Sequence, residues 1–348
     1  MNKIQLFQET FRGRQDVVPR HWVSKDGKKN GYSPLCKNEW NELLCQKTRG
    51  KPCRTCKDKD HIPLSDDWIR RHLDGVDILG VYPLLADNTC GFVAGDFDNH
   101  NGDRTPLADV KAYYEACQVQ EIPCYILRSK SGKGYHTYIF FNKPVPAWKA
   151  RAVAFALLQE AGVIGNDADI SSFDRLFPNQ DHIIAGGIGN LIALPFQKKA
   201  RKKGHTLFLD PDTGFADPLG DQWKVLSEIN RIDESDLDKL IEEWSLKPKK
   251  YETNSSAANP DGWLIKALEG VDEGIPGRDS TATKIAGYFT DKLPKKDILA
   301  ILLAWNSHNR PPLETGVIRK IVDSVKRYKK GESNHVGRGR IKISIGKS

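Results

Sequence analysis

The sequence RSKSGKGYHTYIFF, residues 128–141, joins a loop of small residues to an alternating run of aromatic and aliphatic side chains. A P-loop would require GxxxxGK followed by Ser or Thr between a strand and a helix, and the spacing here differs from that pattern. The alternation predicts instead that the loop opens a β-strand. Backbone N–H groups of residues 129–134 could then face an anion, with Lys133 and His136 beside it. The alternative is a tight hairpin in which His136 is simply packed.

Strand and helix patterns alternate on both sides of this stretch. Further strands are predicted at 78–85, 90–98 and 123–129. One helix is predicted to open at Thr105 and Pro106, which suit the N-cap and N1 positions, and a longer one covers 147–162. Two βαβ-like units around an antiparallel pair predict an α+β sandwich with one open sheet face.

The chain as a whole is long enough for one large domain or two ordinary ones, with 348 residues. Its 53 basic and 45 acidic residues leave a net charge of +8, which favours a polyanionic partner over a merely solvated basic surface. No run of about 18 apolar residues occurs, and the N-terminal residues carry charges where a signal peptide needs an apolar stretch. We therefore expect a cytoplasmic protein with no membrane partner.

Composition divides the chain into five expected parts. Residues 1–62 are irregular and basic, 63–245 follow the α/β pattern, and 246–260 are a linker rich in Lys, Ser, Asn and Pro. Residues 261–330 predict a small all-α domain, and 331–348 a basic, flexible tail. Apolar positions in the all-α part are expected to form its core, namely Ile285, Tyr288, Leu302, Trp305 and Val325.

Acidic residues at the end of one predicted strand form the first candidate site. Asp96 and Asp98 stand at i and i+2, so their side chains project from one face. Two carboxylates so close favour a hard cation such as Mg²⁺ or Mn²⁺, although a solvated strand end explains a lone DxD equally simply. Asp174, followed by polar residues at 179–181, could complete a triad, and Asp169 is the alternative third acid. Three carboxylates beside an anion loop fit two-metal phosphoryl transfer.

Four cysteines lie within twenty-one residues, spaced C-x8-C-x7-C-x2-C. They are Cys36, Cys45, Cys53 and Cys56. The final CxxC is typical of half of a tetrahedral thiolate site, and structural Zn²⁺ would supply the cross-link that a polar sixty-residue segment lacks. His61 is a possible substitute ligand, and four free thiols are the alternative.

Basic residues flank the proposed centre and could follow a nucleic-acid backbone or neutralise a triphosphate. The candidates for binding nucleic acid are Arg12, Arg14, Arg20, Lys198, Lys199, Arg201 and Lys202, with Lys203 and His205 placed toward the nucleotide. A solvated charged loop is the alternative for any single lysine, and Arg175 could instead pair with a neighbouring acid.

The order of these candidate motifs along the chain resembles that of a known family. The series DxD at 96–98, SGxGxH at 131–136 and a hydrophobic residue before Asp174 resembles the archaeo-eukaryotic primase superfamily, whose catalytic core is RRM-like. The segments FDRLFPNQD, 173–181, and GGIGNLIALP, 186–195, more specifically resemble the primase-polymerase domain of TOTE conflict systems and of CRISPR-associated primase-polymerases. Segments at 274–289, 303–313 and 322–328 resemble the helical primase C-terminal domain.

The resemblance implies a DNA primase-polymerase that starts and extends primers by nucleotidyl transfer. It implies that Asp96, Asp98 and Asp174 hold two Mg²⁺ or Mn²⁺ ions. The residues expected around the nucleotide are Arg128, Ser131, Lys133, Gly134, His136, Arg175, Lys203 and His205. Gly134 departs from many relatives, which carry Ser there, and Asp98 stands where many have Glu.

The expected partners are a single-stranded DNA template with its primer, nucleoside triphosphates, and a separate helicase, because the sequence contains no Walker A motif. Two alternatives remain open. One is a gap-filling or end-repair polymerase that extends primers without starting them, and the other is a catalytically silent nucleic-acid-binding module.

Overall fold

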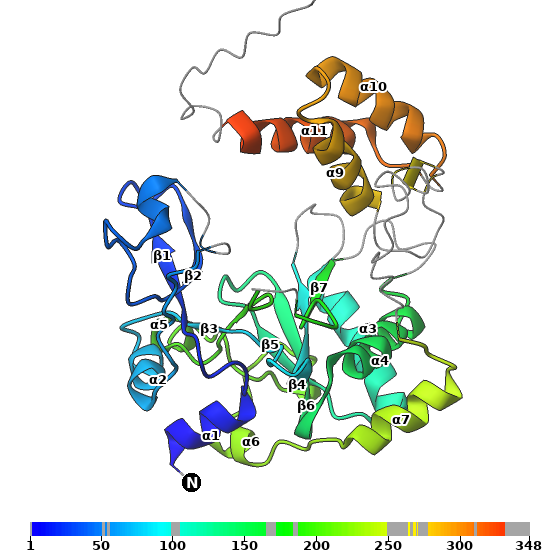
Figure 1. Cartoon of the computed structure of the whole chain (residues 1–348). Helices are drawn as coiled ribbons and strands as arrows, with labels where there is room; N and C mark the ends of the chain where they lie inside the picture. Colours follow the sequence, from blue (N-terminus) through cyan, green and yellow to red (C-terminus); the bar gives the residue numbers. More distant parts are fainter. Residues whose placement is uncertain are drawn as a thin grey trace, which may run out of the picture. The chain divides into compact units, whose positions relative to one another are not determined.

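A computed structural model describes residues 2–50, 53, 56–98, 105–164, 172–183, 187–248, 264, 267–268, 270, 278–309 and 312–330. The chain divides into two compact units, residues 1–251 and 252–348, and each is described by itself (Figure 1). Asp169, the predicted linker and the predicted tail from 331 onward lie largely or wholly outside the described residues.

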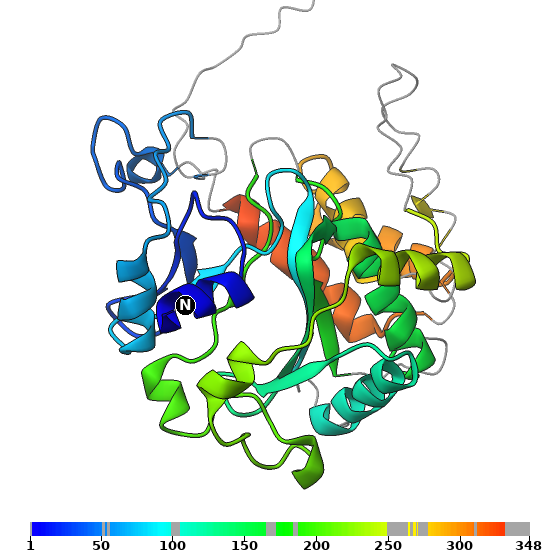
Figure 2. The same cartoon turned by 90° about the horizontal axis from the view of Figure 1, so that it is seen from below.

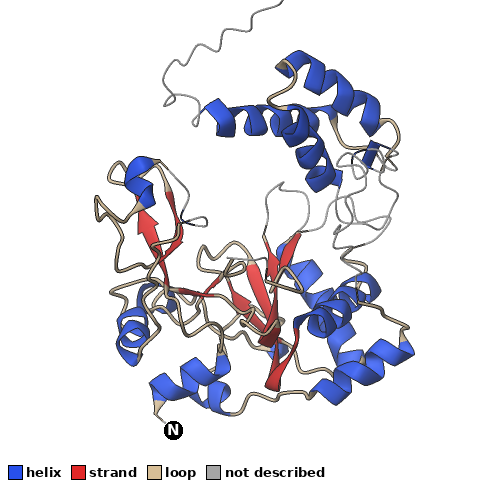
Figure 3. Cartoon of the chain, in the orientation of Figure 1, coloured by secondary structure: helices blue, strands red, loops and turns tan. Residues whose placement is uncertain are grey.

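A four-stranded antiparallel sheet forms the centre of the first unit (Figure 3). Its strands, in spatial order, are β5 (Tyr125–Arg128), β6 (Tyr135–Pro146), β4 (Thr89–Phe97) and β7 (Phe173–Phe177). Helix α3 (Pro106–Val119) connects β4 to β5, and α4 (Ala147–Glu160) connects β6 to β7. This βαββαβ order with both central strands antiparallel is that of the RRM-like fold, so the predicted topology is confirmed.

One face of the sheet is covered by helices α3, α4 and α7 (Glu234–Glu243), which Figure 2 shows together on one side. Pro106 stands at the start of α3, as predicted from its missing N–H. The side chains of Val93, Phe97 and Ile139 point from the sheet into this core, where they meet Leu157 of α4. Alternation along the strands therefore supplies one apolar face to these helices.

The other face of the sheet is also covered, so the prediction of one open face was wrong. Phe92, Tyr138 and Phe140 are at most 1% exposed on this side. They pack with Phe7 of α1 (Lys3–Thr10) and with aromatic residues that follow β8 (Ile192–Ala193). Helix α6 (Gln222–Ser227) adds Leu226 to the same core. At one end of this face, Asp96 stands between two polar neighbours, His136 and Arg175.

The N-terminal residues form a hairpin of β1 (Pro19–Val23) and β2 (Asn30–Pro34), followed by a segment that includes the short helix η1 (Gln46–Arg49). Backbone hydrogen bonds attach this region to the core, because Val18 N–H donates to Ile62 O and His21 N–H to Ile78 O. Strand β3 (Gly80–Val81) continues the contact and pairs with β8. The remaining short helices are α2 (Asp66–Leu73), α5 (Lys198–Arg201) and η3 (Pro211–Thr213).

His72 of α2 is buried and neutral, near the place where the N-terminal region meets the core. Leu79 N–H donates to its Nδ1 at 3.1 Å, so Nε2 carries the proton and donates to Pro195 O at 2.7 Å. Burial lowers the pKa of His72 to about 4, because the charged imidazolium would lose its hydration. Protonation therefore favours the unfolded chain, in which the pKa is about 6.5.

Because of this histidine, the free energy of unfolding should decrease as the pH is lowered. Its contribution is complete above pH 6.5, and about 3 kcal/mol is expected to be lost as the pH falls to about 4. Urea unfolding at several pH values measures the loss, which His72→Gln should remove and which exposed His182→Gln should leave intact. An equal pH dependence in His72→Gln would contradict this assignment.

The second unit contains helices α9 (Arg278–Phe289), α10 (Lys295–Asn306) and α11 (Thr315–Lys330). Ile285, Leu302 and Trp305 are buried at its centre, with Tyr288 and Val325 packed around them, so the predicted core is confirmed. The Asn306 side chain accepts from Leu313 N–H and donates to Leu313 O, both at 2.7 Å, which fixes the turn between α10 and α11. In the described part of the chain, no helix has the length and apolar character that crossing a membrane requires.

Candidate active site

Three neighbouring strands bring the central candidate residues together. Asp96 of β4 lies opposite His136 of β6 on one side and opposite Arg175 of β7 on the other. His136 Nε2 is 3.4 Å from Asp96 Oδ1. The Asp96 and His136 side chains are 26% and 17% exposed, so they border solvent while resting on the aromatic core. Tyr138, the next residue inward on this face, is buried, and both burial and the Asp96 charge raise its pKa.

Asp174 reaches this side through a β-bulge. Asp96 pairs with Arg175 but Phe97 pairs with Phe173, so Asp174 is an extra residue that regular pairing would exclude. A bulge re-aims side chains that strict alternation would place on opposite faces. Arg175 Nε donates to Asp174 Oδ2 at 2.8 Å, and this hydrogen bond is the largest cause of the raised pKa of Arg175.

Several amides of the loop at 129–134 donate within the loop, whereas the prediction had them facing an anion. Gly132 N–H donates to Ser129 O, and Gly134 N–H donates to Ser129 Oγ. Lys133 N–H donates to Ser131 Oγ at 3.2 Å. Phosphate contacts from this loop would therefore come from the exposed side chains of Ser131 and Lys133.

Glycine at 134 is required by close packing against the acidic strand. A Cβ there would lie 2.4 Å from Phe97 O and 3.3 Å from Asp98 Oδ1, so no serine hydroxyl can occupy this position. Gly132 has a φ of +79°, and a Cβ would lie 2.5 Å from the His205 ring. His205 Nδ1 is 3.1 Å from Lys130 O. The loop therefore packs against both Asp98 and His205, two predicted site residues that are far apart in the sequence.

Asp109 is a supporting residue that sequence reasoning missed. Its Oδ2 accepts from Ser172 N–H at 2.8 Å and from Ser172 Oγ at 2.6 Å, and the carboxylate is fully buried. Ser172 O in turn accepts from Asp98 N–H at 2.8 Å. The first turn of α3 therefore holds the ends of β4 and β7 together, and one acid early in a helix carries no sequence signal of that role.

Asp181 has a structural role, in contrast to the nucleotide contact considered for residues 179–181. Its carboxylate pairs with Arg151 of α4 at 2.5 Å, and the two side chains are 6% and 8% exposed. Arg151 also donates to Pro178 O at 2.7 Å, and the Gln180 side chain donates to His182 O. These bonds fix the turn that follows β7.

The predicted basic residues divide into engaged and exposed groups. Arg128 donates to Ala216 O at 2.8 Å, Arg201 donates to Leu73 O at 3.0 Å, and Arg14 is paired with Asp16. Arg20 is half-buried in β1. The exposed members are Arg12, Lys198, Lys199, Lys202 and Lys203. The exposed side chains are therefore better placed to contact a polyanion directly.

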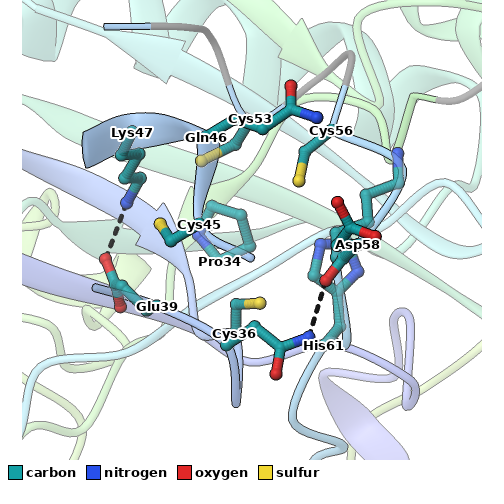
Figure 4. A pocket seen from close by; sticks show the side chains of 12 residues that line it. Pro34, Cys36, Glu39, Cys45, Gln46, Lys47, Cys53, Cys56, Asp58 and His61 are labelled. Atoms are coloured by element: carbon teal, nitrogen blue, oxygen red, sulfur yellow. Dashed lines mark hydrogen bonds and ion pairs between the residues drawn. The ribbon is translucent and has the colours of Figure 1, made fainter. Parts of the chain in front are cut away.

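The four N-terminal cysteines line one pocket, together with His61 (Figure 4). Asp60 N–H donates to Cys36 Sγ at 3.3 Å, and Cys56 N–H donates to Cys53 O in a turn. Lys47 and Glu39 form an ion pair of 2.6 Å at the same pocket. Among the described residues, no three His, Cys, Asp or Glu side chains are grouped as a metal-binding set.

An RRM-like sheet that carries aspartates beside a histidine and a glycine-rich loop is typical of the catalytic cores of primase-polymerases. Residues 2–240 match the family model of the archaeo-eukaryotic primase domain of TOTE conflict systems, and residues 266–331 match that of the primase C terminal 1 domain, PriCT-1. The first match covers more than half of the chain, so the chain belongs to this archaeo-eukaryotic primase family. The resemblance inferred from the motifs is confirmed.

Two solved structures are similar at low identity. The polymerase domain of Mycobacterium tuberculosis Ligase D in complex with DNA is 14% identical, with a TM-score of 0.35 over 69% of this chain and 84% of that one. Primase RepB' is 12% identical, with a TM-score of 0.23 over 95% of this chain and all of that one. No curated protein matches the chain.

Proposed function

We propose that the chain is a DNA primase-polymerase that starts primers on single-stranded DNA and extends them by nucleotidyl transfer. The observation that carries this proposal is the meeting of Asp96, His136 and the Asp174–Arg175 pair at one end of three adjacent strands. Family membership supports it, because primases join nucleoside triphosphates on a DNA template. The PriCT-1 match supports a role for the second unit in initiation.

The carboxylates suit hard divalent ions in their chemistry, since Asp96, Asp98 and Asp174 offer only oxygen ligands. In the structure Asp96 lies beside His136, and Asp174 is bound by Arg175. When bound, two Mg²⁺ or Mn²⁺ ions would activate the attacking 3′ hydroxyl and neutralise the triphosphate. Asp174 can join such a set once Arg175 releases it.

The chain's own side chains would then position the nucleotide. His136 borders Asp96 and can donate a hydrogen bond to a phosphate oxygen from Nε2. Lys133 and Ser131 stand exposed on the adjoining loop, and Arg175 is charged at any working pH, as arginine side chains are. A guanidinium released from Asp174 can bind phosphate through two parallel N–H groups.

Primer synthesis on an unprimed single-stranded DNA circle tests this proposal. Labelled ribo- and deoxyribonucleotides are supplied separately, with Mg²⁺ or Mn²⁺. Products are expected from the circle alone. Extension of an annealed primer without synthesis on the bare circle would favour the gap-filling polymerase, and DNA binding without either product would favour the silent module. A separate helicase is proposed to expose the template.

Asp109 is expected to act through the position of Asp98. Asp109→Ala leaves the Ser172 N–H and hydroxyl without their buried acceptor, which should cost about 1–3 kcal/mol in stability. It should also lower nucleotide incorporation about tenfold and raise the Mn²⁺ concentration needed for half-maximal rate, because Asp98 is displaced. Metal titrations and thermal melts measure the two effects. Asp109→Asn, which keeps an acceptor oxygen, should recover most of both, and an unchanged metal titration in Asp109→Ala would show a purely structural role.

We also propose that the four-cysteine pocket binds one structural Zn²⁺. Four thiolates satisfy tetrahedral zinc, and the Asp60 N–H bond to Cys36 Sγ is the kind of outer contact that orients a ligand. The purified chain should contain about one zinc per molecule by elemental analysis. Cys45→Ser/Cys56→Ser should lose it and become sensitive to proteolysis near residues 22–61, whereas Cys124→Ala, remote from the pocket, should keep it. Zinc retained in the double variant would contradict this site.

A further inference from the structure

Exposed apolar side chains are concentrated in the N-terminal region. Of the seven large hydrophobic residues exposed in the described part of the chain, five lie between positions 22 and 44. They are Trp22, Val23, Trp40, Leu43 and Leu44. Grouped exposure of this kind marks interaction surfaces more often than chance.

Trp22 presents its indole from the β1–β2 hairpin. The ring lies across Gly31 on the paired strand, where a Cβ would be 3.4 Å from Trp22 Cζ2. The glycine backbone thus supports the ring, while Trp22 remains 41% exposed. A flat aromatic side chain supported in this way can stack on a planar ligand with little loss of side-chain entropy.

Trp40 is 67% exposed and has a φ of +68°, in the left-handed region that a bulky residue rarely adopts. Its ring is held by Lys47, whose Nζ lies 5.6 Å from the ring centroid. Six other described non-glycine residues also have a positive φ, so the interest of Trp40 lies in its exposure together with this backbone conformation. Lys47 also lines the cysteine pocket, so one side chain contacts both the Trp40 ring and that pocket.

The same region carries most of the excess positive charge. From Arg20 to His61 there are eleven basic and five acidic residues, a net charge of +6, against +8 for the whole chain. Exposed aromatic rings within a basic segment are the composition of surfaces that bind single-stranded nucleic acid, in which rings stack on bases and cations follow phosphates. An apolar protein partner would have no need of this charge.

The hairpin adjoins the candidate active site. Lys130, in the loop before β6, places its Nζ 5.9 Å from the Tyr32 ring centroid of β2. Tyr32 pairs across the hairpin with His21, and the positive charge of Lys130 lowers the pKa of His21 in addition to burial. The hairpin therefore contacts the loop that also packs against Asp98 through its Tyr32 face, and Trp22, one residue along the strand, points from the opposite face.

We propose that Trp22 and Trp40 stack on bases of single-stranded DNA, so that the N-terminal region holds the template. The identity of the strand as a template rests on the proposed function. Stacking itself requires only that the bases are unpaired, and it does not depend on sequence, because every base has a flat face.

Binding of a labelled oligothymidylate to the full chain, followed by anisotropy, tests this proposal. Trp22→Ala and Trp40→Ala should each weaken binding about five- to hundredfold, and Trp22→Phe and Trp40→Phe should recover most of it. An abasic oligonucleotide of equal length should bind all variants alike, since it offers phosphates without bases. Val119→Ala, which removes an exposed apolar side chain elsewhere, is the matched control.

Wild-type affinity for oligothymidylate in both alanine variants would overturn the proposal and indicate a different partner for the exposed rings. An equal loss on the abasic strand would overturn it too, because the rings would then act without bases. These outcomes are separable from failure of the proposed function. A chain that makes no primers can still show the stacking effect, and a chain that makes primers normally can lack it.

Discussion

Replacing Asp96 with alanine is expected to reduce nucleotide incorporation by about a thousandfold, since a central charged ligand that acts mainly in the transition state contributes roughly 4 kcal/mol. Asp96 stands between His136 and Arg175 on the central strand, so its loss affects both neighbours. Primer extension at saturating nucleotide and metal measures the rate. DNA affinity should stay unchanged, because the candidate template contacts lie elsewhere.

The matched control is Asp212→Ala, an exposed acid on η3 outside the candidate site. It should keep wild-type activity. Asp96→Asn, which preserves shape but removes the charge, should be nearly as inactive as Asp96→Ala. Wild-type incorporation by either Asp96 variant would remove this residue from the catalytic centre.

Breaking the Arg151–Asp181 pair should have the largest effect on stability. Arg151→Met leaves the Asp181 carboxylate buried without its partner, and removal of one member of such a pair costs about 3–5 kcal/mol. The turn after β7 also loses the bond from Arg151 to Pro178 O. Urea unfolding of the full chain measures the free energy of unfolding.

The double variant Arg151→Met/Asp181→Leu distinguishes the cause. Replacing both charges with apolar groups of similar size should recover most of the loss, because no unpaired charge remains. Lys239→Met breaks an exposed ion pair with Asp236 and should change stability by less than about 1 kcal/mol. Equal destabilisation by the single and double variants would show that packing, and not charge, is decisive.

The sheet was predictable because its signal is local. Alternation along β6 and the apolar run of β4 identify strands without knowledge of their partners. The DxD and SGxGxH motifs then identified Asp96 and His136 as candidates, and the structure brings these two within 3.4 Å. Sequence spacing could not show that several amides of the loop at 129–134 donate within the loop.

Other features depend on distant contacts and carry no local signal. The second apolar face was missed because the residues that cover it come from α1 and from segments after β8, which are far in sequence from β4 and β5. Asp181 was placed near the nucleotide because polar residues after a strand are common in sites, whereas its partner Arg151 lies in the preceding helix. Buried polar pairs of this kind are decided by tertiary packing.

The bulge at Asp174 interrupts the regular pairing of the sheet but provides a residue of the candidate site. Deleting this one residue would restore regular pairing between β4 and β7, and the strand would lose only an exposed ion pair. Selection for stability alone would therefore tolerate or favour the shorter strand. Under the proposed function the extra residue serves activity and not pairing, so library variants enriched for thermal resistance without an activity screen should tend to lose it.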